Sequence, residues 1–269
     1  MRTLVISGGS SGIGKATASL FAERGWCVFE LSRHGKEKEM GNGTRVNGKI
    51  IHIFCDVCSE QSTRQAVAEV LQQTDRIDVV ISNAGFGISG PVEFSDMKDI
   101  QRQMDVNFLG AVRFTQAILP QFRKQHFGRI IYTSSVAAVL PVPYQSFYSS
   151  SKAAINAFAL ALANEVRMFG ISVSVMMPGD VSTGFTDARE KSVEGEDIYR
   201  DAHKAIATME RDERSGMNPE QMARLFYHIA TCLCPRPQYV GGLSYRILCL
   251  LDRIFPKRFV NWLEHKVYS

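Results

Sequence analysis

A glycine-rich stretch near the N-terminus, Ser7-Gly8-Gly9-Ser10-Ser11-Gly12-Ile13-Gly14, constrains the fold of this chain more than any other. It follows a short apolar run and opens a helical pattern, as a turn between a strand and a helix does. Gly8 allows the chain to turn, Gly12 allows the backbone to approach a pyrophosphate, and Gly14 allows the helix to pack on the strand. The helix N-terminus adds unpaired N–H groups and the positive end of a dipole. The stretch therefore predicts a dinucleotide site, although such glycines outside this context fit a surface loop equally well.

Short apolar strands alternate with helical patterns along the rest of the chain. Expected strands cover residues 4–6, 27–32, 49–55, 78–82, 129–134, 171–177 and 239–243, and expected helices cover 16–24, 59–74, 96–125 with a break near Asn107, 145–169 and 219–232. Residues 35–48, rich in Gly, Lys and Glu, are expected to form an exposed loop. This alternation predicts parallel strand pairing with right-handed crossovers. The expected fold class is α/β, with a Rossmann-type doubly wound parallel sheet covered on both faces.

The length of 269 residues, 45% of them apolar, is enough to bury a full core, and no linker divides the chain. We predict a single domain over residues 1–237, followed by a helical C-terminal extension, residues 238–269, that packs on the same domain. Residues 184–216 are charged and weakly periodic, which predicts a mobile lid over a substrate site.

The whole net charge of +4 lies in residues 236–269, which carry six basic and two acidic side chains. The apolar side chains of this segment are Leu248, Leu251, Ile254, Phe255, Phe259 and Trp262. The pattern fits either a cationic amphipathic tail that rests on a membrane of acidic lipid or a helical cap with a solvated basic face. We favour the cap. No basic cluster coincides with a known reader motif, so no nucleic-acid partner is expected.

Cysteine usage and the absence of targeting signals bear on the compartment. The chain starts two residues before its first strand, so no signal or transit peptide is expected ahead of the fold. No apolar run is long enough to span a membrane. The six cysteines are scattered, and neither they nor the six histidines have metal-ligand spacing, so no metal is expected. Cys27 and Cys55 are expected to be buried, and a reducing cytoplasm fits best.

Tyr148 and Lys152 open the expected helix over 145–169 and stand four residues apart, so both project from one face. A nearby ammonium favours phenolate and lowers the pKa of a tyrosine from about 10, which suits proton exchange with a carbonyl or an alcohol. Ser135, at the end of the preceding strand, can hold the same substrate oxygen. Most isolated Tyr-x-x-x-Lys pairs are ordinary helix pairs, so the prediction depends on the surrounding motifs.

Taken together, these motifs resemble the classical short-chain dehydrogenase/reductase family up to about residue 185. The matching residues come in the family's order: the glycine-rich turn, Asp56, Asn83-Ala84-Gly85, Asn107, Ser135, Tyr148 to Lys152, and Pro178-Gly179. Ser7 stands where the family usually has Thr, and its hydroxyl can still tie the turn to the neighbouring strand. The basic, aromatic segment beyond residue 237 replaces the family's common ending.

The resemblance implies roles for individual residues. Tyr148 would be the catalytic acid/base, Lys152 would lower its pKa and hold the nicotinamide ribose, and Ser135 would position the substrate carbonyl. Asn107 would support a water that links Lys152 to solvent. Asp56 would hydrogen-bond the adenine, Asn83 would line the cofactor cleft, and Val181 would meet the nicotinamide carboxamide. The implied cofactor site comprises Gly8, Ser10, Ser11, Gly12, Ile13, Gly14, Arg33, Asp56, Val57, Asn83, Ala84, Gly85, Tyr148, Lys152, Pro178, Gly179, Val181 and Thr183.

The end of the second strand bears on the choice of cofactor. An acidic residue there would bind the 2′-hydroxyl of NAD and repel a 2′-phosphate. This chain has Leu31-Ser32-Arg33 instead, and Arg33 can pair with a phosphate while Ser32 donates to it. The sequence therefore favours NADP(H) over NAD(H). The alternative is a solvated arginine at a strand end.

Apolar residues near the expected site indicate a bulky, lipidic alcohol or ketone as substrate. They are Phe86, Ile88, Val136, Val139, Leu140, Pro141, Val142, Pro143, Tyr144, Phe147 and Phe185, some of which could equally pack the sheet edge. Local motifs look like those of hydroxysteroid and retinol dehydrogenases, so a steroid, retinoid or keto-lipid is expected. The alternatives are a 3-oxoacyl thioester reductase, a broad-range carbonyl reductase, and a non-catalytic NADP-binding regulator.

The expected helix over 145–169 is apolar on nearly all sides, with alanines at 153, 154, 157, 159, 161 and 163 along with Phe158, Leu160 and Leu162. Such a helix must be covered on both faces. Core on one side and a second subunit on the other would do this. We therefore predict a homo-oligomer, a dimer or a tetramer, assembled through the helices over 107–125 and 145–169.

Overall fold

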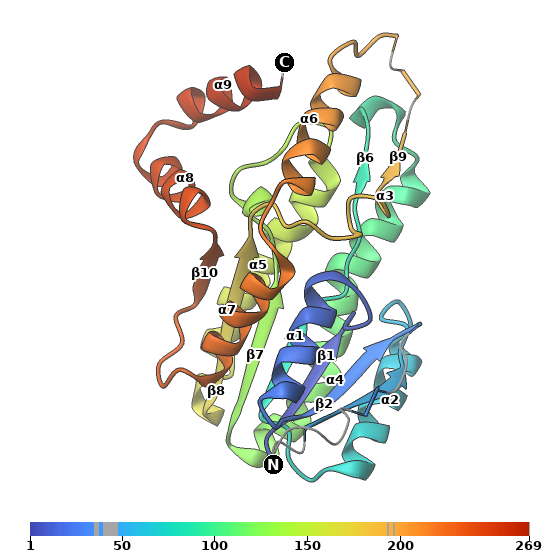
Figure 1. The fold of residues 1–269 in the computed structure, drawn as a ribbon, viewed down its shortest axis with the longest axis vertical. Helices are drawn as coiled ribbons and strands as arrows, with labels where there is room; N and C mark the ends of the chain where they lie inside the picture. The colour runs from blue at the N-terminus through green and yellow to red at the C-terminus, as the bar shows by residue number, and fades with distance from the viewer. Residues whose placement is uncertain (35–37, 40–47, 193, 196, 269) are drawn as a thin grey trace.

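An eight-stranded sheet forms the centre of the structure, a computed structural model that describes residues 1–34, 38–39, 48–192, 194–195 and 197–268 (Figure 1). Its strands, in spatial order, are β10 (Gln238–Gly241), β8 (Ile171–Pro178), β7 (Gly128–Thr133), β5 (Val79–Ser82), β1 (Thr3–Ser7), β2 (Cys27–Ser32), β4 (Lys49–Phe54) and β3 (Lys38–Glu39). Every pair is parallel except β3 with β4. A second, two-stranded sheet pairs β6 (Ile88–Ser89) with β9 (Glu190–Lys191).

Helices cover both faces of the sheet. They are α1 (Gly12–Glu23), α2 (Glu60–Gln73), α3 (Met97–Met104), α4 (Gly110–Gln125), α5 (Ser146–Glu165), α6 (Ala202–Arg214), α7 (Pro219–Thr231), α8 (Leu243–Ile254) and α9 (Lys257–Tyr268), with short turns η1 (Val92–Phe94), η2 (Asp105–Leu109), η3 (Val136–Ala138) and η4 (Arg167–Phe169). Along β1, Leu4 and Ile6 pack with α1 and α7, whereas Val5 packs with the core under α2, α4 and α5. The two-residue alternation of a strand thus supplies two cores, one on each face.

The structure confirms the predicted doubly wound parallel sheet. The expected break near Asn107 is a π-turn, η2, and the expected strand over 239–243 is β10. The expected helix over 145–169 ends at Glu165, and Cys27 and Cys55 are buried as predicted. The two-residue strand β3 lies inside the expected loop over 35–48, most of which falls outside the described residues.

Two predicted segments have more structure than their sequence patterns indicated. Residues 184–216 contain β9 and α6, and α6 buries Ala202, Ala205, Ile206 and Met209. That they act as a mobile lid stays a prediction. The division at residue 237 also stays a prediction, although β10, within the predicted extension, pairs with β8 in the central sheet. Helices α8 and α9 stand outside the sheet beyond β10, where α9 approaches α6 (Figure 1).

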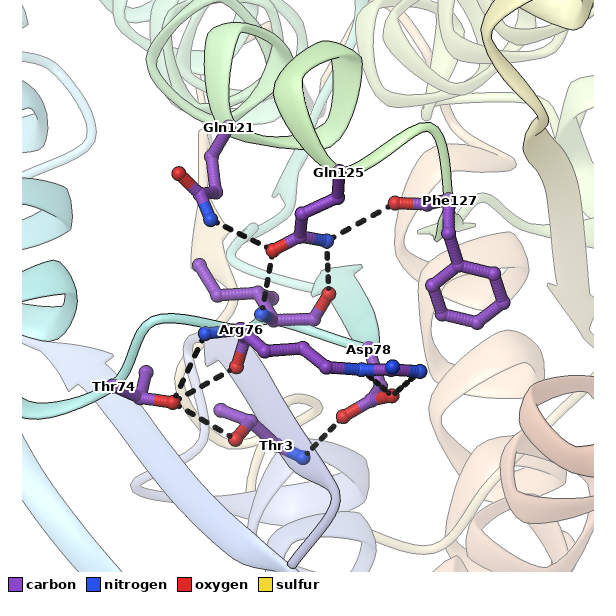
Figure 2. A network of polar contacts seen from close by, with 8 residues as sticks. Thr3, Thr74, Arg76, Asp78, Gln121, Gln125 and Phe127 are labelled. Atoms are coloured by element: carbon purple, nitrogen blue, oxygen red, sulfur yellow. Dashed lines mark hydrogen bonds and ion pairs between the residues drawn. The ribbon is translucent and has the colours of Figure 1, made fainter.

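A network of polar contacts lies at the N-terminal ends of β1 and β5 (Figure 2). The buried Asp78 accepts a hydrogen bond from Thr3 N at 2.8 Å and one from Arg76 Nε at 2.8 Å. Gln125 accepts from Ile77 N at 3.0 Å and donates to Ile77 O at 2.8 Å. These side chains satisfy backbone groups at the N-terminal ends of the strands. The cavity described below lies at the opposite, carboxyl ends of the strands.

Candidate active site

A cavity of about 1100 Å³ runs along the carboxyl ends of the parallel strands. In an open α/β sheet this edge is where ligands bind. The predicted cofactor residues that line the cavity are Gly8, Ser10, Ser11, Gly12, Ile13, Arg33, Asp56, Val57, Asn83, Ala84, Gly85, Tyr148, Lys152, Pro178, Gly179, Val181 and Thr183. Ser135 lines it too, whereas Gly14 and Asn107 do not. The structure thus brings the sequence-predicted residues together in one space.

The glycine-rich turn has the backbone of a phosphate cradle. Gly8 (φ 67°) and Gly12 (φ 51°) are in the left-handed region that favours glycine. Within the described part of the chain, no side chain caps the start of α1, so its first N–H groups face the turn without a side-chain partner. These features fit a dinucleotide pyrophosphate. Gly14 has a packing role, because a Cβ there would lie 2.1 Å from Gly8 O. Its assignment as a cofactor contact stays a prediction.

Asn83 and Ser7 join the turn to the neighbouring strand end. Ser7 Oγ accepts hydrogen bonds from Asn83 N at 3.1 Å and Ala84 N at 3.3 Å, which confirms the predicted tie. The Asn83 amide donates to Gly8 O at 3.0 Å and accepts from Thr133 Oγ1 at 3.1 Å. Three strand ends, those of β1, β5 and β7, are therefore fixed relative to one another on the cavity wall.

Tyr148 and Lys152 lie one turn apart on α5, where Tyr148 is half-buried and Lys152 is buried. Lys152 Nζ lies 5.7 Å from the centroid of the Tyr148 ring and donates to Thr133 O at 3.0 Å. Ser135 precedes η3 and its Oγ accepts from Ala137 N at 3.1 Å, which fixes the hydroxyl beside Tyr148. The three side chains thus face one cavity wall, as the helical spacing predicts.

Asn107 acts from behind this wall. Its place in a π-turn is typical of functional sites, because an extra residue re-aims the side chains around it. The amide accepts from Phe86 N at 3.0 Å and donates to Phe86 O at 3.0 Å and to Ser151 Oγ at 3.1 Å. A Cβ on Gly85 would lie 3.1 Å from Asn107 Oδ1 and 3.3 Å from Lys152 Nζ. Asn107 and Lys152 therefore converge on Gly85, where a side chain would crowd both of them.

The protonation of this pair differs from the expectation that Lys152 lowers the pKa of Tyr148. Burial raises the pKa of Tyr148 to about 12, and a hydrogen bond from Ser135 opposes this rise. Burial also lowers the pKa of Lys152 to about 8. Burial acts on both groups, and the Lys152 ammonium is directed at Thr133 O, so it does not offset the rise in the pKa of Tyr148. Near neutral pH the phenol keeps its proton, which suits a proton donor to a ketone.

Sequence reasoning missed a group of carboxylates on the cavity wall near Tyr148. Glu213 accepts from Thr186 Oγ1 at 2.7 Å and pairs with the buried Arg189, and Asp180 accepts a short hydrogen bond from Tyr245 on α8. Glu213 and Asp180 both raise the pKa of Tyr148, while Arg189 lowers it. Asp180 directly follows the Pro178-Gly179 motif. Its position in the sequence could therefore have indicated that it lies at the site.

The opposite end of the cavity, near the end of β2, is more complex than the sequence indicates. Arg33 and His34 are exposed and line the cavity. Ser32, however, donates its hydroxyl to Glu30 Oε2 at 3.2 Å, and His52 Nδ1 lies 2.8 Å from the same oxygen. Ser32 lines the cavity with its hydroxyl donated to Glu30, and its expected role as a phosphate donor stays a prediction. Glu30 is buried next to Ser32. It is an acidic residue that comes just before the stretch Leu31-Ser32-Arg33, on which the choice of cofactor was argued.

The apolar pocket has a different wall from the one expected. Phe86, Val136, Leu140, Pro141, Val142 and Phe185 line the cavity, but Ile88, Val139, Pro143, Tyr144 and Phe147 do not. Helices α8 and α9 instead supply Leu248, Leu251, Phe255, Phe259, Val260, Leu263 and Val267. The ring of Phe185 lies 5.8 Å from that of Tyr148, centroid to centroid. The C-terminal extension therefore forms the far wall of the pocket, which its expected packing as a cap did not anticipate.

Fold and site together define an oxidoreductase of the dinucleotide-binding α/β class that acts on alcohol and keto groups. Residues 2–194 match the family model described as short chain dehydrogenase. The chain belongs to the short-chain dehydrogenase/reductase family, whose members bind a nicotinamide cofactor.

Relatives across the family share most of the chain. A 3-ketodihydrosphingosine reductase from Bacteroides thetaiotaomicron is 39% identical over 222 residues, 81% of this chain and 80% of the relative. Retinol dehydrogenase 8 from Bos taurus is 30% identical over 271 residues, 95% and 86% of the two chains. The crystal structure of a short-chain dehydrogenase from Streptomyces avermitilis superposes with a TM-score of 0.81 at 24% identity, covering 98% of this chain and 97% of that one.

Proposed function

We propose that this protein is an NADP(H)-dependent reductase of long-chain ketones, with Tyr148 as the proton donor. The observation that carries the proposal is one continuous cavity that holds the phosphate cradle, Tyr148 and the apolar wall of α8 and α9. When bound, the nicotinamide supplies the hydride. The protein places the ketone carbon beside it, and Tyr148 donates a proton to the ketone oxygen while Ser135 holds that oxygen. Lys152, charged below its pKa of about 8, stabilises the negative charge that develops.

We further propose that the ketone carries an ammonium group close to the carbonyl. Beyond the cofactor residues, acidic side chains outnumber basic ones in the described cavity lining: Asp180, Glu190, Asp212, Glu213, Asp252 and Glu264 line it against Arg102, which pairs with Glu190. Burial raises the pKa of Asp180, and the charges of Glu213 and Asp212 raise it further. An ammonium would relieve this repulsion. The reductase from Bacteroides thetaiotaomicron acts, by its name, on 3-ketodihydrosphingosine, a long-chain ketone with an adjacent amine.

A matched pair of substrates tests this function. We expect NADPH oxidation with 3-ketodihydrosphingosine to proceed with a kcat/KM about ten-fold or more above that of its N-acetylated form, because a charge-assisted contact is worth about 1.5–3 kcal/mol. In an Asp180→Asn variant that preference should shrink. Turnover of both ketones without preference would remove the ammonium but leave the reductase. No turnover of any long-chain ketone would contradict the reductase itself.

The preference for NADP(H) is proposed on Arg33, which is exposed at the adenosine end of the cavity. An Arg33→Asp variant should lower the ratio of kcat/KM for NADPH to that for NADH by roughly 100-fold, since it removes a charged contact with the 2′-phosphate and adds a repulsive charge. Arg33→Lys, which keeps the charge but not the planar fork, should fall between the two. Equal use of both cofactors by the unaltered protein would contradict the preference.

We also propose that the protein is a homo-oligomer and that it is located in the cytoplasm. Ala153, Ala157, Leu160 and Ala161 are exposed along one side of α5, which leaves an apolar face without cover. A second copy would cover it, and the predicted interface also includes residues 107–125. Light scattering at micromolar concentration should give a mass of at least two chains. A mass of one chain would refute the oligomer.

A further inference from the structure

The outward side of α8 carries an uncovered apolar stripe. Leu243, Ile247, Leu250 and Ile254 are spaced by four, three and four residues, so they lie along one side of the helix. Their exposed fractions are 73%, 52%, 55% and 67%. A stripe of large aliphatic side chains is not a usual feature of a solvated face, because contiguous exposed apolar surface marks a contact site.

Basic side chains flank this stripe and continue onto α9. Arg246 and Arg253 each precede a stripe residue by one position, so they lie along its edge. On α9, Arg258, Trp262 and Lys266 follow at four-residue intervals, and all three are exposed. The two acidic residues of the segment do not neutralise this charge on the outer surface. Asp252 is buried and accepts a hydrogen bond from Lys257 Nζ at 2.6 Å, and Glu264 lines the cavity. The outward charge of α8 and α9 is therefore cationic.

The other side of the same helices faces the cavity. Leu248 and Leu251 on α8, and Phe255 just after its end, line the cavity from another side than the stripe, as Phe259 and Leu263 do on α9. These side chains are also exposed in part. The two helices thus separate the substrate pocket from the outside by the thickness of one helix, with apolar side chains on both surfaces.

We propose that α8 and α9 dock this protein on an anionic lipid bilayer, with the stripe in the headgroup and acyl boundary and the basic residues on the acidic headgroups. An amphipathic helix with aliphatic and Trp side chains on one side and Lys or Arg beside them binds such a surface. A second copy of the chain is a poorer occupant, because it would bring two cationic surfaces together. Among the described residues, no helix combines the length and apolar character needed to cross a bilayer, so the contact is peripheral. An apolar substrate could then pass between bilayer and pocket past α8 and α9.

Vesicle sedimentation tests the docking surface. The full-length protein is mixed with vesicles of phosphatidylcholine alone or of equal parts phosphatidylcholine and phosphatidylserine. We expect binding to the anionic vesicles, weakened by salt. A stripe variant, Ile247→Gln with Leu250→Gln and Ile254→Gln, should lose at least about ten-fold in affinity. A charge variant, Arg258→Gln with Lys266→Gln, should lose roughly 25-fold on anionic vesicles, about five-fold per cation.

Controls separate docking from misfolding and from self-association. Met168→Gln replaces an equally exposed apolar side chain on η4, away from α8, and should bind like the unaltered protein. All variants should keep turnover of a short water-soluble ketone, because none of the altered residues lines the cavity. Trp262 is exposed and Trp26 is buried, so a blue shift of fluorescence on vesicle addition would come from α9.

Three results would overturn the proposal. The first is that the unaltered protein sediments with neither kind of vesicle. The second is that the stripe variant and Met168→Gln bind equally well. The third is that the stripe variant turns an oligomer into a monomer without any change in vesicle binding, which would assign the stripe to a second copy of the chain.

Discussion

Replacing Tyr148 with Phe is expected to lower kcat for ketone reduction by roughly 10³-fold while the dissociation constant for NADPH changes by less than about two-fold. The ring stays in place against Phe185, so packing is kept and only the hydroxyl is lost. In the proposed function that hydroxyl donates the proton, while Ser135 holds the ketone oxygen. Stopped-flow turnover and fluorescence titration of NADPH measure the two quantities separately.

Tyr144→Phe is the matched control. It removes the same atom from a tyrosine four residues earlier that does not line the main cavity, so activity should stay near that of the unaltered protein. Should Tyr148→Phe keep more than about a tenth of normal turnover, the proton would have to come from another group, and Tyr148 would be reduced to a substrate contact. Loss of both turnover and NADPH binding would instead indicate a collapsed site.

The sheet and the catalytic pair could be predicted from the sequence because both depend on short-range spacing. A strand repeats every two residues and a helix brings positions four apart onto one face, so β2 and the pair Tyr148 and Lys152 follow directly from the order of residues. The break at Asn107 was visible for the same reason, since the helical pattern falters there.

Contacts between distant segments could not be predicted in this way. Tyr245 packs its ring on Gly179, where a Cβ would lie 2.1 Å from the ring, and bonds Asp180, yet 65 residues separate the two partners. The hydrogen bond of Ser32 to Glu30 also involves His52 on β4, 22 residues from Glu30, which the pattern of β2 alone does not show. The far wall of the pocket was missed because α8 and α9 have apolar residues on two sides, and the sequence pattern resolved only one.

The electrostatic state of the site was also beyond sequence spacing. A four-residue interval places an amine near a phenol, but the size of its effect depends on where the ammonium points and how much water remains. Here Lys152 is directed at Thr133 O, and burial acts on both groups. The resulting order, a phenol that holds its proton and an amine that releases its proton near pH 8, is a property of the folded cavity.

That order makes Lys152 the source of a defined pH dependence. Because burial lowers the pKa of the amine to about 8, the ammonium is present below this pH and lost above it. We expect kcat/KM for ketone reduction to be flat below about pH 7.5 and to fall about ten-fold per pH unit well above 8. Lys152→Gln should lower kcat/KM at pH 7 by roughly 10²- to 10³-fold and abolish this alkaline limb. A limb that persists in the variant would belong to another group.

A second substitution at this position, Lys152→Met, should affect stability in the opposite direction from activity, which separates a catalytic role for Lys152 from a structural one. A buried ammonium destabilises the folded state, because its pKa falls from 10.5 in the unfolded chain to about 8. Above about pH 10.5 the amine is neutral in both states and does not lower the free energy of unfolding. As pH falls from there through 8, the unfolded and then the folded chain take up the proton, and the free energy of unfolding decreases. Lys152→Met should therefore raise the free energy of unfolding at pH 7, and this gain should shrink as pH approaches 10. Chemical denaturation at both pH values measures it. A variant that is inactive and also less stable at pH 7 would mean that Lys152 stabilises the fold through its hydrogen bond to Thr133 O and has no direct role in the reaction.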